Sequence, residues 1–145
     1  MISKSCQYAI RAAVFLASRA DENLKMNVKI IAKEIDAPEA FTAKTLQILN
    51  KHSIITSLKG PHGGFFIEEH QLDAPILNIV NAIDGLQIFK SCGLGLKKCS
   101  ETNPCPFHND YKILRDAMLS TFEKTTIRIL AHNLENGDPF LLAGR

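Results

Sequence analysis

The sequence predicts a mainly α-helical protein with one small β-hairpin and a long helix near its end. Apolar residues recur at steps of three and four through most of the chain, which is the period of a helix with one buried face. Between residues 54 and 67, two short β-branched and aromatic runs flank a glycine-rich segment, which is the signal of a hairpin. The 145 residues suit one compact domain, or a small domain with a helical appendage.

The first third of the chain predicts three helices. Ser3 is expected to cap a helix that ends by residues 21–23, and Asn27 a second helix that breaks at residues 36–37. Pro38 fits the first turn of the third helix, where its missing N–H costs nothing. The apolar side of this helix is expected to hold Phe41, Thr45, Ile48 and Leu49. Two helices joined by a tight turn after a longer one form a helix-turn-helix.

The next segment predicts a hairpin and a fourth helix. Residues 54–58 and 65–67 are the expected strands, and residues 59–64 form the turn between them. A hairpin placed directly after the third helix is a wing, so the first part of the chain is expected to be a winged helix-turn-helix domain. Asp73 is then expected to cap a helix from residue 75 to about residue 84.

The helical period returns at residue 109 and continues to residue 135, with residues 136–139 as its stop signal. Its apolar stripe consists of Leu114, Met118, Phe122, Thr125 and Ile129. We expect this stripe to pair with a second copy in a homodimer, because two-fold dimers are the commonest oligomers. The alternative is that the helix folds back on its own domain. The expected division is a DNA-binding domain at 1–84, a cysteine-rich loop at 85–108, a dimerisation helix at 109–136 and a tail at 137–145.

Charge favours double-stranded DNA as the partner of the first half. Residues 1–67 carry nine Lys and Arg against five Asp and Glu, whereas residues 68–145 carry eight against ten. The second helix of a helix-turn-helix enters the major groove, and a slim wing can approach the minor groove. The candidate DNA contacts are Glu39, Ala40, Thr42, Ala43, Lys44, Gln47 and Lys51 in the helix and Lys59, Gly60, Pro61, His62 and Gly63 in the wing. A protein-interaction module that binds no DNA is the alternative.

Three of the four cysteines fall in one loop, in the pattern C-x6-C-x5-C-x2-H. The candidate metal ligands are Cys92, Cys99, Cys105 and His108, because thiolate and imidazole bind both zinc and iron–sulfur clusters. Structural zinc sites usually offer cysteine pairs with two to four residues between them, so the wider gaps of six and five residues favour an iron–sulfur cluster. Zinc and a set of redox-active thiols stay open as alternatives.

Composition bounds the setting of this loop. The chain has no apolar run near the roughly 20 residues that a membrane helix requires, and its start does not lead into a signal-peptide core. We therefore expect a cytoplasmic protein with no membrane partner, in which thiols stay reduced. We do not expect an enzyme, because no phosphate-cradling glycine loop, serine–histidine pair or paired carboxylates stand out.

The chain resembles the Rrf family of bacterial winged-helix transcription regulators, which includes iron–sulfur cluster regulators, nitric-oxide-sensing repressors and cysteine-metabolism repressors. The matching segments are residues 3–4, 8–12, 38–49, 59–65 and 83–85, together with the three-cysteine loop. The resemblance implies a homodimer that binds operator DNA and senses iron–sulfur status, redox state or nitric oxide.

The resemblance also implies a ligand set. Cys92, Cys99 and Cys105 correspond to the family's cluster ligands, and His108 lies where the iron–sulfur cluster regulators supply a histidine to a [2Fe-2S] cluster. The nitric-oxide-sensing branch completes a [4Fe-4S] cluster with a carboxylate, but this chain has Gln7 at that position, so [2Fe-2S] is favoured. Cys6, next to Gln7, is an outside candidate for the fourth ligand. A sample prepared in air is expected to lose the cluster readily.

Overall fold

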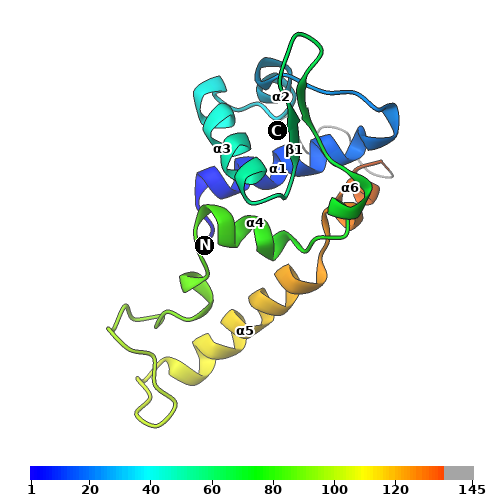
Figure 1. Ribbon diagram of the computed structural model, residues 1–145. Helices are drawn as coiled ribbons and strands as arrows, with labels where there is room; N and C mark the ends of the chain where they lie inside the picture. Colours follow the sequence, from blue (N-terminus) through cyan, green and yellow to red (C-terminus); the bar gives the residue numbers. More distant parts are fainter. Residues whose placement is uncertain (136–145) are drawn as a thin grey trace.

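The computed structural model describes residues 1–135 and has an N-terminal helical unit from which one long helix and a loop project (Figure 1). The α-helices are α1 (Lys4–Ser18), α2 (Val28–Glu34), α3 (Glu39–Lys51), α4 (Ile76–Ile83), α5 (His108–Lys124) and α6 (Ile127–Glu135). The short 3-10 helices are η1 (Ala20–Glu22), η2 (Glu69–Gln71) and η3 (Gln87–Phe89), and the strands are β1 (Thr56–Leu58) and β2 (Gly64–Phe66). The expected mainly α fold with a hairpin wing is confirmed.

The two predicted helix caps at the start of the chain are confirmed. The Ser3 side chain accepts a hydrogen bond from the backbone N–H of Cys6 at 3.1 Å. Asn27 accepts one from the N–H of Ile30 at 2.9 Å. Each bond satisfies a backbone donor that the first helical turn leaves without an intrahelical partner. The caps therefore set where α1 and α2 begin.

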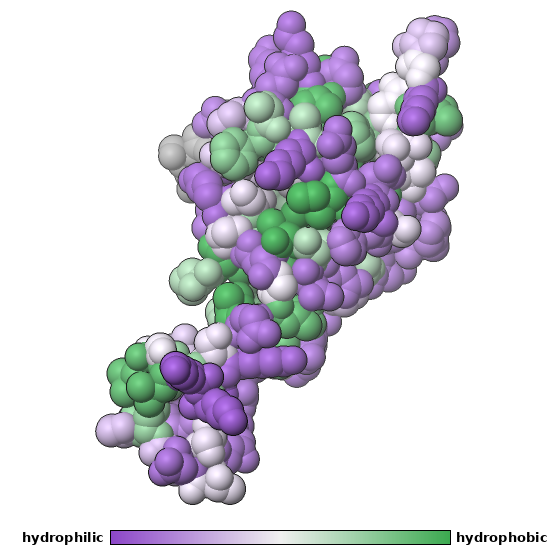
Figure 2. Space-filling view, turned by 60° about the vertical axis from the view of Figure 1, so that its left-hand side comes forward, coloured by the Kyte–Doolittle hydropathy of each residue, from purple (hydrophilic) through white to green (hydrophobic). Residues whose placement is uncertain are grey.

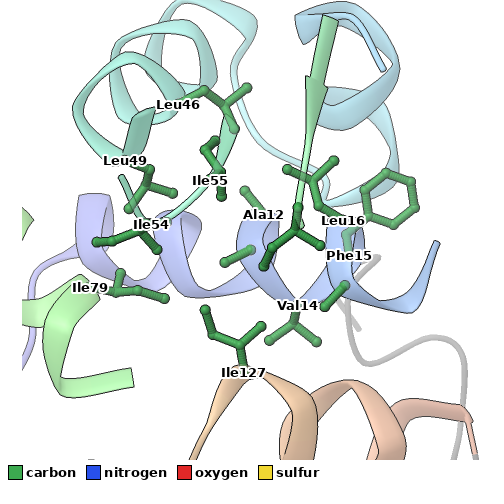
Figure 3. Close-up of a cluster of buried hydrophobic side chains, with 14 of the residues drawn as sticks. Ala12, Val14, Phe15, Leu16, Leu46, Leu49, Ile54, Ile55, Ile79 and Ile127 are labelled. Carbon is green, nitrogen blue, oxygen red and sulfur yellow. The ribbon is translucent and has the colours of Figure 1, made fainter. Parts of the chain in front are cut away.

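One core joins α1, α2, α3, α4 and α6, and Figure 3 shows part of it. Its fully buried large side chains include Ile31, Ile35, Leu46, Leu49, Ile55, Ile79 and Ile127. Because these residues come from both ends of the described chain, the N-terminal unit cannot pack completely without α6. The core thus holds α3 and the wing on one rigid support.

The buried face of α3 differs from the expected one. Its buried residues are Thr42, Thr45, Leu46 and Leu49, whereas Phe41 is 52% exposed. The prediction that Phe41 faces the core is wrong, because positions 42, 45, 46 and 49 form an equally regular helical stripe that carries Leu46. The Thr42 hydroxyl donates to the carbonyl of Pro38 at 3.0 Å, which allows this polar residue to be buried.

The wing consists of two antiparallel strands, β1 and β2, and Met26, in the linker between α1 and α2, extends this sheet. Thr56 pairs with Phe66 and Leu58 with Gly64, and Met26 adds a bridge to Phe65. A Cβ at position 63 would lie 2.0 Å from the carbonyl oxygen of Leu58, so only glycine fits there. The tight turn that carries the wing tip therefore depends on Gly63.

The expected single helix over residues 109–135 is instead two helices. Thr125 is extended, and its carbonyl accepts from the N–H of Ile76, while the N–H of Ile127 donates to Ala74. These bonds turn the chain back, so that α6 packs against α1, while α5 projects away (Figure 1). The alternative that the helix folds back on its own domain is thus correct for α6. The predicted stop at residues 136–139 and the tail at 137–145 lie outside the described residues.

The start of α4 also differs from the prediction. Pro75 occupies the N-cap position and no side chain caps the helix, so the expectation that Asp73 is the cap is wrong. The Asp73 carboxylate instead accepts hydrogen bonds from Arg128 of α6.

Among the described residues, no helix is long and apolar enough to cross a membrane.

Candidate functional site

The cysteine-rich loop lies between η3 and the start of α5, at the end of the molecule farthest from the wing (Figure 1). Together with the start of α5 it forms a separate lower lobe, part of whose surface is hydrophobic (Figure 2). Leu94, Leu96 and Phe107 contribute exposed apolar side chains to this loop. A pocket of about 170 Å³ opens in the loop, and Cys92, Cys99, Cys105 and His108 all line it. The four predicted ligands are therefore brought to one place.

The four donors are arranged as two pairs. The sulfurs of Cys92 and Cys105 are 3.7 Å apart, and the sulfur of Cys99 is 3.3 Å from Nδ1 of His108. Within residues 1–135, no three Cys, His, Asp or Glu side chains are grouped so that they could hold a single metal ion. All four cysteines of the chain are free thiols. A single tetrahedral ion needs its four ligands around one centre, whereas a binuclear centre takes two protein ligands on each metal.

The surroundings of Cys92 favour an anionic sulfur. The backbone N–H of Leu94 donates to this sulfur at 3.4 Å. Hydrogen bonds from the backbone of Leu94 and then Leu96 lower the pKa of Cys92 below its usual range. Thiolate is the form that binds metal, so the hydrogen bonds of this turn would suit Cys92 to bind a metal.

Arg115 of α5 contacts the second pair. Its Nη1 lies 3.3 Å from the sulfur of Cys99 and also donates to the carbonyls of Lys90 and Ser91 at 3.0 and 2.8 Å. The hydrogen bond with Cys99 is the main reason that the pKa of Arg115 is raised. One guanidinium therefore joins α5, the start of the loop and a candidate ligand.

An aromatic side chain holds the loop against α5. The Tyr111 ring packs on Gly93, where an added Cβ would lie 2.6 Å from the ring. Phe107 lies on the same ring, with centroids 5.6 Å apart. Gly93 is thus required next to Cys92 because the ring occupies the space of a side chain.

Cys6 is not part of this pocket. It has no exposed surface and packs with Val80 and Phe89. Burial, and then the charge of Asp84, raise the pKa of Cys6 to about 12. A buried neutral thiol is a poor ligand, so the structure offers His108 rather than Cys6 as the fourth donor.

The DNA-binding candidates mostly lie on exposed surfaces. Glu39, Ala40, Lys44, Gln47 and Lys51 of α3 are exposed, as are Lys59, Gly60, Pro61 and His62 at the wing tip, while Ala43 and Gly63 are half-buried. Thr42 is the exception, because it is only 1% exposed. The prediction that Thr42 is a DNA contact is therefore wrong.

Sequence reasoning missed an aromatic cluster beside α3. Phe41 contacts the ring of Tyr8 edge-on, with centroids 6.4 Å apart, and Lys4 and Arg11 each place a cation 5.5 Å from the Tyr8 ring. Placing Thr42, Leu46 and Leu49 on one helical stripe would have turned Phe41 outward. The cluster extends the exposed face of α3 onto α1.

Comparisons with known proteins match nearly the whole chain. The Rrf2 family, described as iron-dependent transcriptional regulators, matches residues 2–133. An HTH-type transcriptional regulator of Aquifex aeolicus is 33% identical over 132 residues, which cover 90% of each chain. The protein rrf2 of Nitratidesulfovibrio vulgaris is 26% identical over 99 residues, covering 68% of this chain and 61% of that protein. The matching family is one of transcriptional regulators, in agreement with the expectation that the chain is not an enzyme.

Two solved structures share the fold. IscR of T. potens is 17% identical with a TM-score of 0.74, covering 95% of this chain and 90% of that one. CymR, the global cysteine regulator of B. subtilis, is 20% identical with a TM-score of 0.73, covering 91% of this chain and 96% of that one. The resemblance noted from the wing and the cysteine loop is confirmed: the chain belongs to the Rrf2 family of transcriptional regulators.

Proposed function

We propose that this protein is a homodimeric, DNA-binding regulator that senses iron–sulfur status, redox state or nitric oxide through a [2Fe-2S] cluster. The single observation that carries this proposal is the pairing of the donors, with Cys92 beside Cys105 and Cys99 beside His108. Two pairs in one pocket suit a centre of two irons better than one zinc ion.

The donor chemistry also suits such a centre. Backbone N–H groups and a buried cation face the sulfurs of Cys92 and Cys99, and hydrogen bonds to sulfur stabilise anionic thiolates. When bound, the cluster would supply a redox-active iron centre that oxidants or nitric oxide can alter. Cys92 and Cys105 would hold one iron, and Cys99 and His108 the other.

The position of His108 supports a link between this site and the dimer. His108 is the first residue of α5 and is buried. A cluster bound to His108 would therefore also fix the start of this helix. Further along α5, Ile113 and Leu114 are 69% and 65% exposed, which leaves an apolar face for a second copy. Gain or loss of the cluster would then order or free the cysteine-rich loop. The conformation of the loop would in turn set how two copies of α5 pair and how far apart the two DNA-binding units lie.

Operator DNA would meet α3 and the wing. Lys44, Gln47 and Lys51 are exposed along α3, and Lys59 and His62 are exposed on the wing. These donors suit phosphates and base edges. Binding to operator fragments should weaken steeply with salt because phosphate contacts release counterions. A protein that shows no salt-sensitive DNA binding would instead be an interaction module.

The test is anaerobic purification with a visible spectrum and iron, sulfide and zinc assays. We expect a brown protein that holds iron and sulfide in equal amounts, lost in Cys92→Ala and His108→Ala but kept in Cys6→Ala, whose thiol lies outside the pocket. A colourless wild-type protein loaded with zinc would refute the proposal. Equal operator affinity of the cluster-loaded and cluster-free proteins would refute sensing.

A second candidate rests on the 3.7 Å separation of the Cys92 and Cys105 sulfurs. Two thiols this close could give up two protons and two electrons to a peroxide and form a disulfide; hydrogen peroxide would be reduced to two water molecules, and an organic hydroperoxide to an alcohol and one water molecule. This reading predicts a colourless, metal-free anaerobic protein in which peroxide links Cys92 to Cys105. Peptide mapping of that linkage distinguishes it from the cluster.

A further inference from the structure

Arg115 is a buried cation in the wall of the cysteine loop. Only 8% of its surface is exposed, although it lies on the projecting helix α5. Its Nη1 contacts two backbone carbonyls, of Lys90 and Ser91, and the sulfur of Cys99. Its Nε is buried and has no hydrogen-bond partner within the described part of the chain.

The charge of Arg115 has no carboxylate partner at hydrogen-bonding distance. Among the ion pairs of residues 1–135 none includes Arg115, and the nearby Asp116 is bound by Lys112 at 2.6 Å instead. A buried charge is costly unless an opposite charge is close to it. Carbonyls carry only partial charge, so the one contacting atom that can carry a full negative charge is the sulfur of Cys99. A negative charge on this sulfur, as in a metal-bound thiolate, would therefore balance Arg115.

We propose that Arg115 is a positioning residue of the cluster site: its guanidinium ties α5 to the start of the loop and to Cys99, and it balances the negative charge of the sulfur centre. This inference rests on the proposed function, because it takes Cys99 as a cluster ligand. Arg115 is not one of the four proposed ligands, but it would control how firmly the cluster is held and how readily the cluster is reduced.

Two consequences follow from the contacts. Partners that orient a metal ligand contribute about 10- to 100-fold to metal retention, so loss of the guanidinium should speed cluster loss. A nearby positive charge also stabilises the reduced form of the centre, which carries one more electron, over the oxidised form. Removal of that charge should shift the midpoint potential to more negative values.

The experiment compares the anaerobically purified wild-type protein with Arg115→Gln, Arg115→Lys and Lys112→Gln. Lys112→Gln is the matched control, because Lys112 lies one helical turn before Arg115 and also carries a positive charge. Its side chain, however, is 37% exposed and bound to Asp116. The readouts are the rate of iron release to a chelator, the midpoint potential from spectroscopic titration, and the far-ultraviolet circular dichroism spectrum.

We expect Arg115→Gln to release iron at least about 10-fold faster than wild type and to have a lower potential, with Lys112→Gln unchanged in both. Arg115→Lys keeps the charge but not the planar fork, so it should keep the potential and release iron faster. Arg115→Gln values equal to those of Lys112→Gln would overturn the inference. If Arg115→Gln does not fold, a wild-type release rate in Arg115→Lys overturns it. A wild-type protein that holds no cluster refutes the proposed function instead.

Discussion

Arg128 of α6 and Asp73, which precedes α4, form a two-point ion pair across 55 residues of sequence. Nε of Arg128 lies 2.7 Å from Oδ1 of Asp73, and Nη2 lies 3.2 Å from Oδ2. Nη2 also donates to Glu69 of η2 at 2.7 Å. The fork of a guanidinium matches a carboxylate in this way, so the pair fixes the orientation of α6 on the N-terminal unit.

This pair predicts a pH-dependent contribution to stability. The hydrogen bond from Arg128 lowers the pKa of Asp73 below its ordinary value of 3.8. A carboxylate whose pKa is lower in the folded state stabilises that state above the ordinary value, and the contribution is lost as the pH falls through the lowered one. We expect Asp73→Asn to be less stable than wild type at pH 7, with the difference shrinking below about pH 4.

Urea unfolding at a series of pH values measures this effect. Asp21→Asn is the matched control, because Asp21 is an exposed acid in η1. The control should follow wild type across the series. A difference between Asp73→Asn and wild type that grows as the pH falls would contradict the assignment.

Packing of α6 into the core gives a second prediction. Ile127 has no exposed surface, whereas Ile129, in the same helix, is 44% exposed. Truncation of a buried isoleucine to alanine costs about 2–5 kcal/mol, and exposed sites usually change stability by about 0.5 kcal/mol or less. We therefore expect Ile127→Ala to lower the free energy of unfolding far more than Ile129→Ala. Equal losses in chemical denaturation would mean that α6 does not pack on the core.

The sequence predicted most elements of the fold because their signals are local. Ser3 and Asn27 cap the helices that follow them, and glycines around residue 63 mark the wing. The break between α5 and α6 could not be predicted, because the residues around Thr125 continue the helical period. Backbone hydrogen bonds to Ala74 and Ile76, far away in sequence, override that period.

The candidate site divides in the same way. The spacing of Cys92, Cys99 and Cys105 is a local pattern, and the structure brings all three to one pocket with His108. Arg115 lies in an ordinary helical stretch, and only the folded loop shows its contact with Cys99. The sequence of α3 offers two regular helical stripes, one that includes Phe41 and one that includes Thr42. Only the packing in the folded protein shows that the second stripe is buried.

Cysteine reactivity offers a third prediction. Burial leaves Cys6 with no exposed surface and a pKa of about 12, so it should resist alkylation. Cys99 and Cys105 are half-buried and Cys92 is 9% exposed, but all three line the pocket, and the lowered pKa of Cys92 favours its reactive thiolate, so the three should react in the metal-free protein. Brief N-ethylmaleimide treatment at pH 8 followed by peptide mass spectrometry should find the three loop cysteines modified. The denatured protein should react at Cys6 as well, and fast labelling of Cys6 in the folded protein would contradict its place in the core.

The two faces of α3 predict opposite effects of neighbouring substitutions. Lys44 is exposed, whereas Thr42 is buried and donates to Pro38. With DNA fragments that the wild-type protein selects, Lys44→Gln should weaken binding and reduce the slope of log affinity against log salt by about 1, as expected for one lost phosphate contact. Thr42→Val should leave affinity and slope unchanged and lower the free energy of unfolding by about 1 kcal/mol, because a buried hydrogen bond is lost. Titrations at several salt concentrations decide this, and weakened DNA binding in a stably folded Thr42→Val protein would show that the buried face has been assigned wrongly.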